Sequence, residues 1–127
     1  MILNCYNILC VGAGSCLGGM ARYVISRYVD PSSGSGFPWG TLAVNLLGCL
    51  CLGLIYGLLA RNLQMSEGMR LFLTVGFCGG FTTFSTFINE NYLMLTNGEI
   101  ASSILYAALS LIGGLLLLYS GYLLTRL

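Results

Sequence analysis

The chain has 127 residues, of which 57% are hydrophobic and only 7% are charged, compared with roughly 25% charged residues in an ordinary soluble domain. This composition excludes a water-soluble monomer, and a net charge of +1 without any basic cluster excludes a nucleic-acid-binding protein. Because the chain has no histidine and few acidic residues, most metal sites and most acid–base catalysis are excluded as well, and we expect no enzyme activity.

Four charge-free runs divide the chain, at residues 1–21, 31–60, 71–89 and 100–125. A helix that spans a bilayer needs about 20 mostly apolar residues, and each run is long enough for one crossing. Four crossings leave room only for short connections. We therefore expect an all-α membrane protein in which residues 1–127 form a single domain of four transmembrane helices.

The first transmembrane helix is expected from about Leu3 to Tyr28. Arg22 and Arg27 then approach the far interface, where long basic side chains extend toward water. For Arg22 two interpretations stay open: a basic residue at the mouth of an ion path, or an anchor at the interface. Glycines four residues apart, which allow close helix packing, recur in three predicted helices as Gly14 and Gly18, Gly53 and Gly57, and Gly76 and Gly80.

The second helix is expected from about Gly40 to Ala60, after a turn-rich segment at residues 30–38. Trp39 stands where an interfacial aromatic residue is typical. Asn45 lies in the middle of this apolar helix, where an unpaired amide costs a few kcal/mol. Its side chain therefore either forms an interhelical hydrogen bond or lines an ion path as a donor.

A break is expected in the third helix. Residues Arg61 to Met69 form a short polar connection, and the helix that follows contains the segment Gly79–Phe87, which reads GGFTTFSTF. Paired glycines weaken a helix, and clustered hydroxyl groups compete for its backbone hydrogen bonds. At membrane depth an unwound backbone is tolerated only where it is buried in protein or lines a cavity. Broken helices commonly mark ion sites.

Three side chains of the third helix are candidates for an ion path. Phe84 and Phe87 are three residues apart and share a helix face, so they either pack together or turn their positive ring edges toward an anion. Glu90 follows Phe87 by one turn. It is either a functional acid within the membrane or an interfacial residue.

The fourth helix is expected from about Ile100 to Leu124, which places both termini on one side of the membrane. Tyr106 and Ser110 present hydroxyl groups on one face of this helix. The side of the termini carries Arg61, Arg70 and Arg126, and the other side carries Arg22 and Arg27. Because arginine bias between the loops sets orientation, this near tie favours insertion in both orientations and pairing of the chain with its own inverted copy.

The segments Gly76–Phe87 and Gly40–Gly48, together with Gly18 and Arg22, resemble the signatures of the Fluc family of small fluoride channels. The resemblance covers nearly the whole chain. It implies an antiparallel, dual-topology homodimer in the plasma membrane, with two pores that export fluoride passively and so relieve its toxicity. The implied partners are fluoride, membrane lipid and a second copy of the chain, or a homologous chain in a heterodimer.

The same resemblance implies roles for individual residues. A structural sodium ion is implied on the dimer axis, held by the backbone carbonyls of Gly79 and Thr82 from both subunits. Many relatives have a second hydroxyl residue one turn after the position of Ser110, and here that residue is Gly114. The residues expected to line the fluoride pore are Arg22, Thr41, Asn45, Thr83, Phe84, Ser85, Thr86, Phe87, Glu90, Tyr106 and Ser110.

Two other functions are compatible with four short transmembrane helices. A dual-topology, proton-coupled exporter of small cations would use Glu90. Exporters of the small multidrug-resistance family depend on an acid in the first helix, however, and this chain has no acid before Asp30. A structural membrane subunit without transport would leave the hydroxyl-rich segment of the third helix without a purpose.

Overall fold

The computed structural model describes residues 3–30, 36–62 and 64–127. Within these residues every regular element is a helix, and four helical spans are long and apolar enough to cross a membrane. The spans are Cys5–Val29, Trp39–Ala60, Glu67–Thr96 and Ile100–Arg126. The prediction of an all-α protein with four transmembrane helices is therefore confirmed.

Three of the spans are continuous helices, namely α1 (Cys5–Val29), α2 (Trp39–Ala60) and α6 (Ile100–Arg126). The third span combines α3 (Glu67–Leu71), the π-helical η1 (Phe72–Cys78), α4 (Gly79–Phe81) and α5 (Ser85–Thr96). The helix begins at Glu67, inside the expected connection, because the Ser66 side chain accepts a hydrogen bond from the Met69 N–H at 3.1 Å and caps it.

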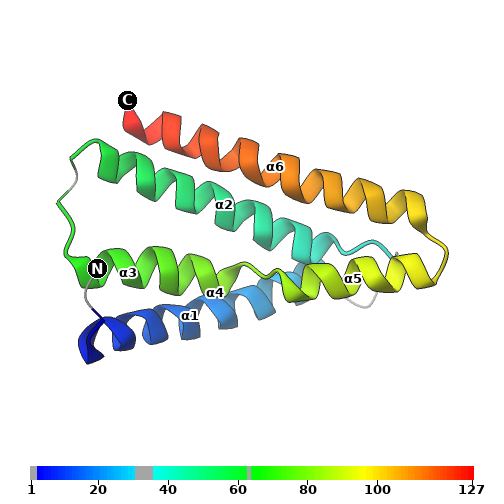
Figure 1. The fold of residues 1–127 in the computed structure, drawn as a ribbon, viewed down its shortest axis with the longest axis horizontal. Helices are drawn as coiled ribbons and strands as arrows, with labels where there is room; N and C mark the ends of the chain where they lie inside the picture. The colour runs from blue at the N-terminus through cyan, green and yellow to red at the C-terminus, as the bar shows by residue number, and fades with distance from the viewer. Residues whose placement is uncertain (1–2, 31–35, 63) are drawn as a thin grey trace.

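The spans run alternately up and down, so the molecule has two distinct ends (Figure 1). Both termini and the connection from α2 to α3 lie at one end, here called the terminal end. The other side of the molecule, here called the opposite end, holds the connection from α5 to α6 and, short of that connection, the last turn of α1 and the first turn of α2. Of the turn-rich segment 30–38, residues 31–35 lie outside the described residues.

Glycines bring the spans into close contact, as their spacing predicts. A Cβ atom on Gly18 would collide with the carbonyl oxygen of Phe77, and one on Gly53 would collide with that of Leu118. Gly80 also lies against the backbone of a neighbouring helix, because a Cβ atom added there would stand 2.7 Å from the Ser15 carbonyl oxygen. The glycine faces therefore join α1 to η1 and α4, and α2 to α6.

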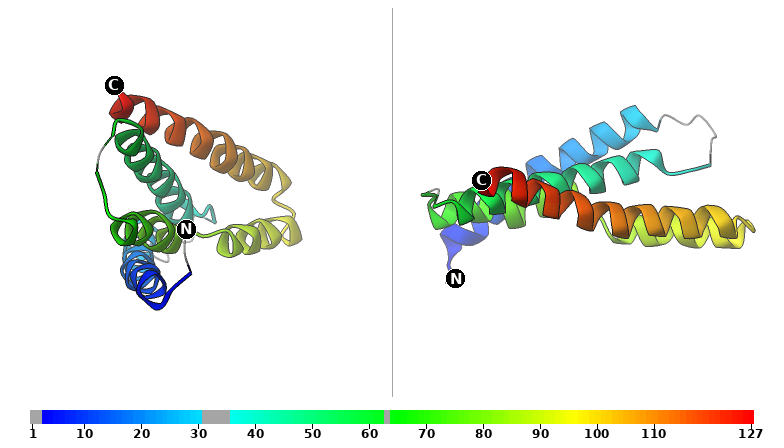
Figure 2. Two further views of the ribbon diagram at one scale, coloured as in Figure 1. Left: turned by 60° about the vertical axis from the view of Figure 1, so that its left-hand side comes forward. Right: turned by 90° about the horizontal axis from the view of Figure 1, so that it is seen from above.

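The part of the third span after Phe81 leaves this tight packing. Figure 2 shows α5 running beside α6 toward the opposite end, while the last turns of α1 and the first turns of α2 diverge from them. A small core at this end contains Leu42, Phe87, Met94 and Tyr106. The most apolar windows of the four spans are only 11% to 33% buried, so most of the apolar surface faces lipid or another protein.

Candidate functional site

The third span is non-helical from Thr82 to Phe84, near its middle. Thr82 has an extended backbone (φ −93°, ψ 161°), and the helix ends at Phe81. The N–H and the hydroxyl group of Thr82 both donate to the carbonyl oxygen of Cys78, at 3.1 and 3.0 Å. A side-chain hydroxyl that shares a helical acceptor in this way is the local competition that threonine introduces into helices.

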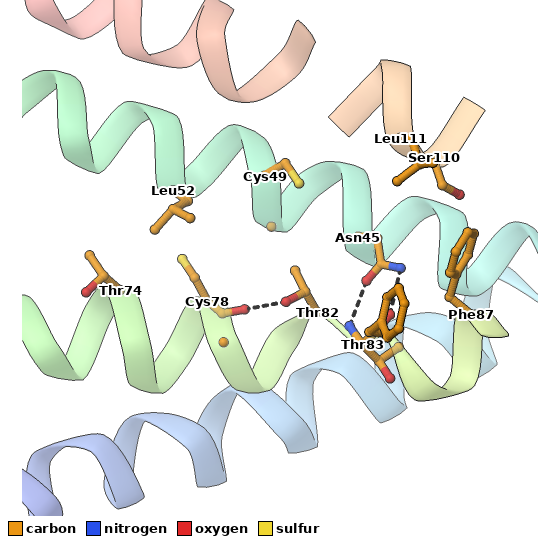
Figure 3. A pocket seen from close by; sticks show the side chains of 13 residues that line it. Asn45, Cys49, Leu52, Thr74, Cys78, Thr82, Thr83, Phe87, Ser110 and Leu111 are labelled. Atoms are coloured by element: carbon orange, nitrogen blue, oxygen red, sulfur yellow. Dashed lines mark hydrogen bonds between the residues drawn. The ribbon is translucent and has the colours of Figure 1, made fainter. Parts of the chain in front are cut away.

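Asn45 of α2 holds the non-helical residues in place. The Thr83 N–H donates to Asn45 Oδ1 at 2.8 Å, and Asn45 Nδ2 donates back to the Thr83 carbonyl oxygen at 3.0 Å (Figure 3). The Thr83 hydroxyl oxygen then accepts from the Thr86 N–H at 3.3 Å and caps α5. The interhelical hydrogen bond expected for Asn45 is thus present, whereas its role on an ion path stays a prediction.

Arg22 of α1 holds the helix just before the break. Its Nε–H donates to the carbonyl oxygen of Gly80 at 3.0 Å, and its side chain is half-buried. Carbonyl groups in the last turn of a helix lack helical partners, so this contact satisfies one of them. Helical side chains lean toward the N-terminus, and this one reaches from α1 to the break. Whether Arg22 is a residue at the mouth of an ion path or an anchor at the interface stays a prediction.

Glu90 lies in a buried hydrogen-bond network between three helices. Thr41 Oγ1 of α2 donates to Glu90 Oε2 at 2.9 Å, and the Tyr106 hydroxyl of α6 donates to Oε1 at 2.7 Å. Tyr106 is completely buried and Thr41 is 6% exposed. Glu90 itself is half-buried. Its two interpretations, a functional acid within the membrane and an interfacial residue, stay predictions.

The two phenylalanines of the third span lie in different environments. Phe87 is buried and Phe84 is 71% exposed, with their ring centroids 6.0 Å apart. The Phe87 ring also packs against Tyr106, at 5.1 Å between centroids. Phe87 therefore belongs to the core of this single chain, while Phe84 projects from it.

A cavity of about 300 Å³ adjoins the non-helical segment, between α2, the third span and α6 (Figure 3). Ser110 lines this cavity, and its buried hydroxyl oxygen has no hydrogen-bond partner among the described residues. The cavity is also lined by Asn45, Thr82, Thr83, Phe84, Phe87 and Gly79, all of them expected at the site, and by Thr74, Cys49 and Cys78, which no sequence pattern indicated.

The remaining predicted site residues do not line the cavity. Thr41, Glu90 and Tyr106 form the separate network on the far side of Phe87, and Arg22 lies on the α1 side of the break. Ser85 is exposed and Thr86 is half-buried at the start of α5. The predicted residues therefore divide into a cavity group and a network group.

Sequence reasoning missed two features next to the network. Phe37, inside the turn-rich segment, packs its ring against Tyr106, and nothing in the pattern of that segment distinguishes an inward-facing residue. Asn91 accepts a hydrogen bond from the Ser103 hydroxyl at 2.8 Å and so joins α5 to α6. An asparagine one residue after Glu90 was a signal for such a contact.

Among the described residues, no three histidine, cysteine, aspartate or glutamate side chains come together in a way that would hold a metal ion. Gly79 is exposed, and a Cβ atom there would meet only the Thr74 carbonyl oxygen, at 3.9 Å. The backbone at Gly79 thus faces open space.

Comparison with known proteins identifies the family. Residues 9–122 match the model of the family described as CrcB-like protein, Camphor Resistance (CrcB). A protein named fluoride-specific ion channel FluC from Chlorobaculum tepidum is 50% identical, with 95% of each chain covered. Proteins of the same name from Chlorobium phaeobacteroides (strain BS1) and Hydrogenovibrio crunogenus are 48% and 45% identical, over 94% and 91% of this chain and 93% and 87% of theirs. These relatives and the four apolar spans show that the chain is a multi-pass plasma-membrane protein that belongs to the CrcB-like family.

Proposed function

We propose that the chain is a fluoride-selective channel that lets fluoride leave the cell passively and so relieves its toxicity. The names of relatives that align over nearly the whole chain support the choice of ion. The observation that carries the proposal is the cavity at the break, which is lined by Phe84, Phe87 and Ser110 and where the buried Ser110 hydroxyl has no partner among the residues that the structure describes.

The chemistry of this cavity suits a small, strongly hydrated anion. Fluoride gives up its bound water only where other hydrogen-bond donors replace it. The Ser110 hydroxyl, which has no partner within the described part of the chain, would supply one such donor. The positive edges of the Phe84 and Phe87 rings supply a second kind of contact. Chloride is larger and gains less from each donor, so cavity size and donor strength together would favour fluoride.

The proposed assembly is an antiparallel homodimer in dual topology, with two pores. The large apolar surface of the isolated chain, including the exposed Phe84, supports a second copy. The near tie in the arginine count also supports it, with Arg61, Arg70 and Arg126 on the side of the termini and Arg22 and Arg27 in the second half of α1. Arg22 is engaged at the break, so it contributes less to the arginine bias that sets orientation. A chain of fixed orientation that forms a heterodimer with a homologous chain is therefore the alternative. Reporter fusions at the C-terminus separate them, since a homodimer requires both orientations in equal amounts.

A structural sodium ion on the dimer axis completes the proposed assembly. The backbone carbonyls of Gly79 and Thr82 from both copies would hold it, and the open space at Gly79 fits this role. The ion would supply positive charge that fixes the unwound segments of the two subunits together.

Fluoride release from liposomes tests the proposal. The purified protein is reconstituted into liposomes loaded with potassium fluoride, valinomycin is added to balance charge, and an electrode follows external fluoride. Fast release of fluoride, with none of chloride in a parallel run, is the expected result. If well-folded dimers release no fluoride, or release chloride equally fast, the proposed function is wrong. Transport of a small cation that is driven by a proton gradient, without any fluoride release, would favour the cation exporter built on Glu90.

A further inference from the structure

A continuous row of aromatic rings runs from the break to the opposite end of the molecule. Phe87 packs against Tyr106 at 5.1 Å between ring centroids, and Tyr106 packs against Phe37 at 5.5 Å with the planes at 74°. Phe37 in turn packs against Trp39 at 4.5 Å. The row ends at the start of α2, at the opposite end of the molecule.

The backbone before α2 holds Phe37 in an inward position. Gly36 has φ +80°, a conformation that other residues adopt only with strain. Pro38 is buried, and the Trp39 N–H donates to the Phe37 carbonyl oxygen at 2.9 Å. This tight turn directs the Phe37 ring onto the core cluster rather than into the surroundings.

Phe37 packs on Tyr106, which is one of the two hydrogen-bond donors to Glu90. Tyr106, whose hydroxyl donates to Glu90, is completely buried, while Phe37 itself is half-buried. Thr41, the other donor to Glu90, lies in the first turn of α2, four residues after Phe37. A fluoride path that continues from the cavity past Phe87 and the network, as the proposed function expects, would meet the Phe37 ring before it leaves the protein on this side.

Resting on the proposed function, we propose that Phe37 is the outer constriction of the fluoride path. An apolar ring at a narrow mouth excludes water, and a hydrated anion crosses such a constriction slowly. The cavity at the break selects the anion, and Phe37 limits the rate at which the anion exchanges with water at the opposite end. Loss of the ring admits water to the mouth and speeds exchange without changing selectivity.

The test compares full-length variants in the liposome assay. Phe37→Ala should release fluoride roughly threefold to tenfold faster than the unmodified protein, which corresponds to a barrier lower by about 0.7 to 1.4 kcal/mol. Phe37→Trp, which enlarges the ring, should slow release. Tyr28→Ala removes an aromatic side chain that is 87% exposed at the same end and should leave the rate unchanged. Chloride release should remain absent in all three.

Each outcome is decisive for Phe37. Unchanged release from Phe37→Ala, or slower release from correctly assembled protein, would overturn the constriction; slower release would mean that the ring only supports Tyr106. If Phe37→Ala does not fold, Phe37→Trp decides alone, because an unchanged rate in that variant contradicts the proposal. The unmodified protein, measured in the same run, tests the proposed function separately, since absence of release there rejects the channel itself.

Discussion

Replacement of Asn45 by leucine removes the two hydrogen bonds that hold Thr83, at 2.8 and 3.0 Å, with little change of shape. A buried backbone group left without a partner costs about 1–3 kcal/mol, so two such groups cost about 2–6 kcal/mol. Hydrogen bonds between membrane helices average only about 0.6 kcal/mol, which sets a lower limit near 1 kcal/mol for two. We expect the free energy of unfolding of Asn45→Leu to fall within these limits.

The same substitution should abolish most fluoride release. Phe84 directly follows Thr83, so release of the Thr83 backbone lets the Phe84 ring and the start of α5 shift away from the cavity. Thermal unfolding in detergent measures the stability, and the fluoride electrode measures release from liposomes.

Asn91→Leu is the matched control for Asn45→Leu. Asn91 also makes two side-chain hydrogen bonds. It donates to the Phe87 carbonyl oxygen at 2.9 Å within α5, and it accepts from the Ser103 hydroxyl of α6 at 2.8 Å. We expect a comparable loss of stability with release largely retained. The reasoning is refuted if Asn45→Leu keeps normal stability and release, or if Asn91→Leu abolishes release equally.

Four further substitutions test other parts of the structure. Phe84→Leu and Phe87→Leu should each slow fluoride release by about twofold to tenfold, which corresponds to the free energy of one aromatic contact. Assembly, measured by gel filtration, should persist, and normal release in both variants would reject a role for the ring edges. Gly53→Ala places a Cβ atom against a backbone carbonyl of α6 and should lower thermal stability by about 1–3 kcal/mol, whereas Gly12→Ala, in open space, should not. Glu90→Gln keeps acceptor and donor groups for both neighbouring hydroxyls, so release should stay within about tenfold of normal and independent of a proton gradient; complete loss of a proton-driven activity would instead identify an exporter.

Local properties of the sequence were sufficient to predict the spans and their closest contacts. Hydrophobicity along the chain determines which segments cross a bilayer, since each span satisfies its own backbone. The bounds predicted for the first, second and fourth helices match the structure within a few residues, whereas the third span, Glu67–Thr96, extends beyond its charge-free run at both ends. The glycine pairs were equally informative, because only a missing side chain permits a carbonyl of one helix to touch the backbone of another. The non-helical residues Thr82 to Phe84 also lie inside the segment that local composition singled out.

Only the tertiary structure decided which side chains meet. Asn45 and Thr83 are 38 residues apart in the chain, and Arg22 and Gly80 are 58 apart, so no local pattern could pair them. For the same reason, sequence spacing showed that Phe84 and Phe87 share a face but not that one is exposed and the other buried. Helix formation depends on residues within a few positions of each other, whereas these contacts depend on how three helices cross, and the crossing is set by packing between segments far apart in the sequence.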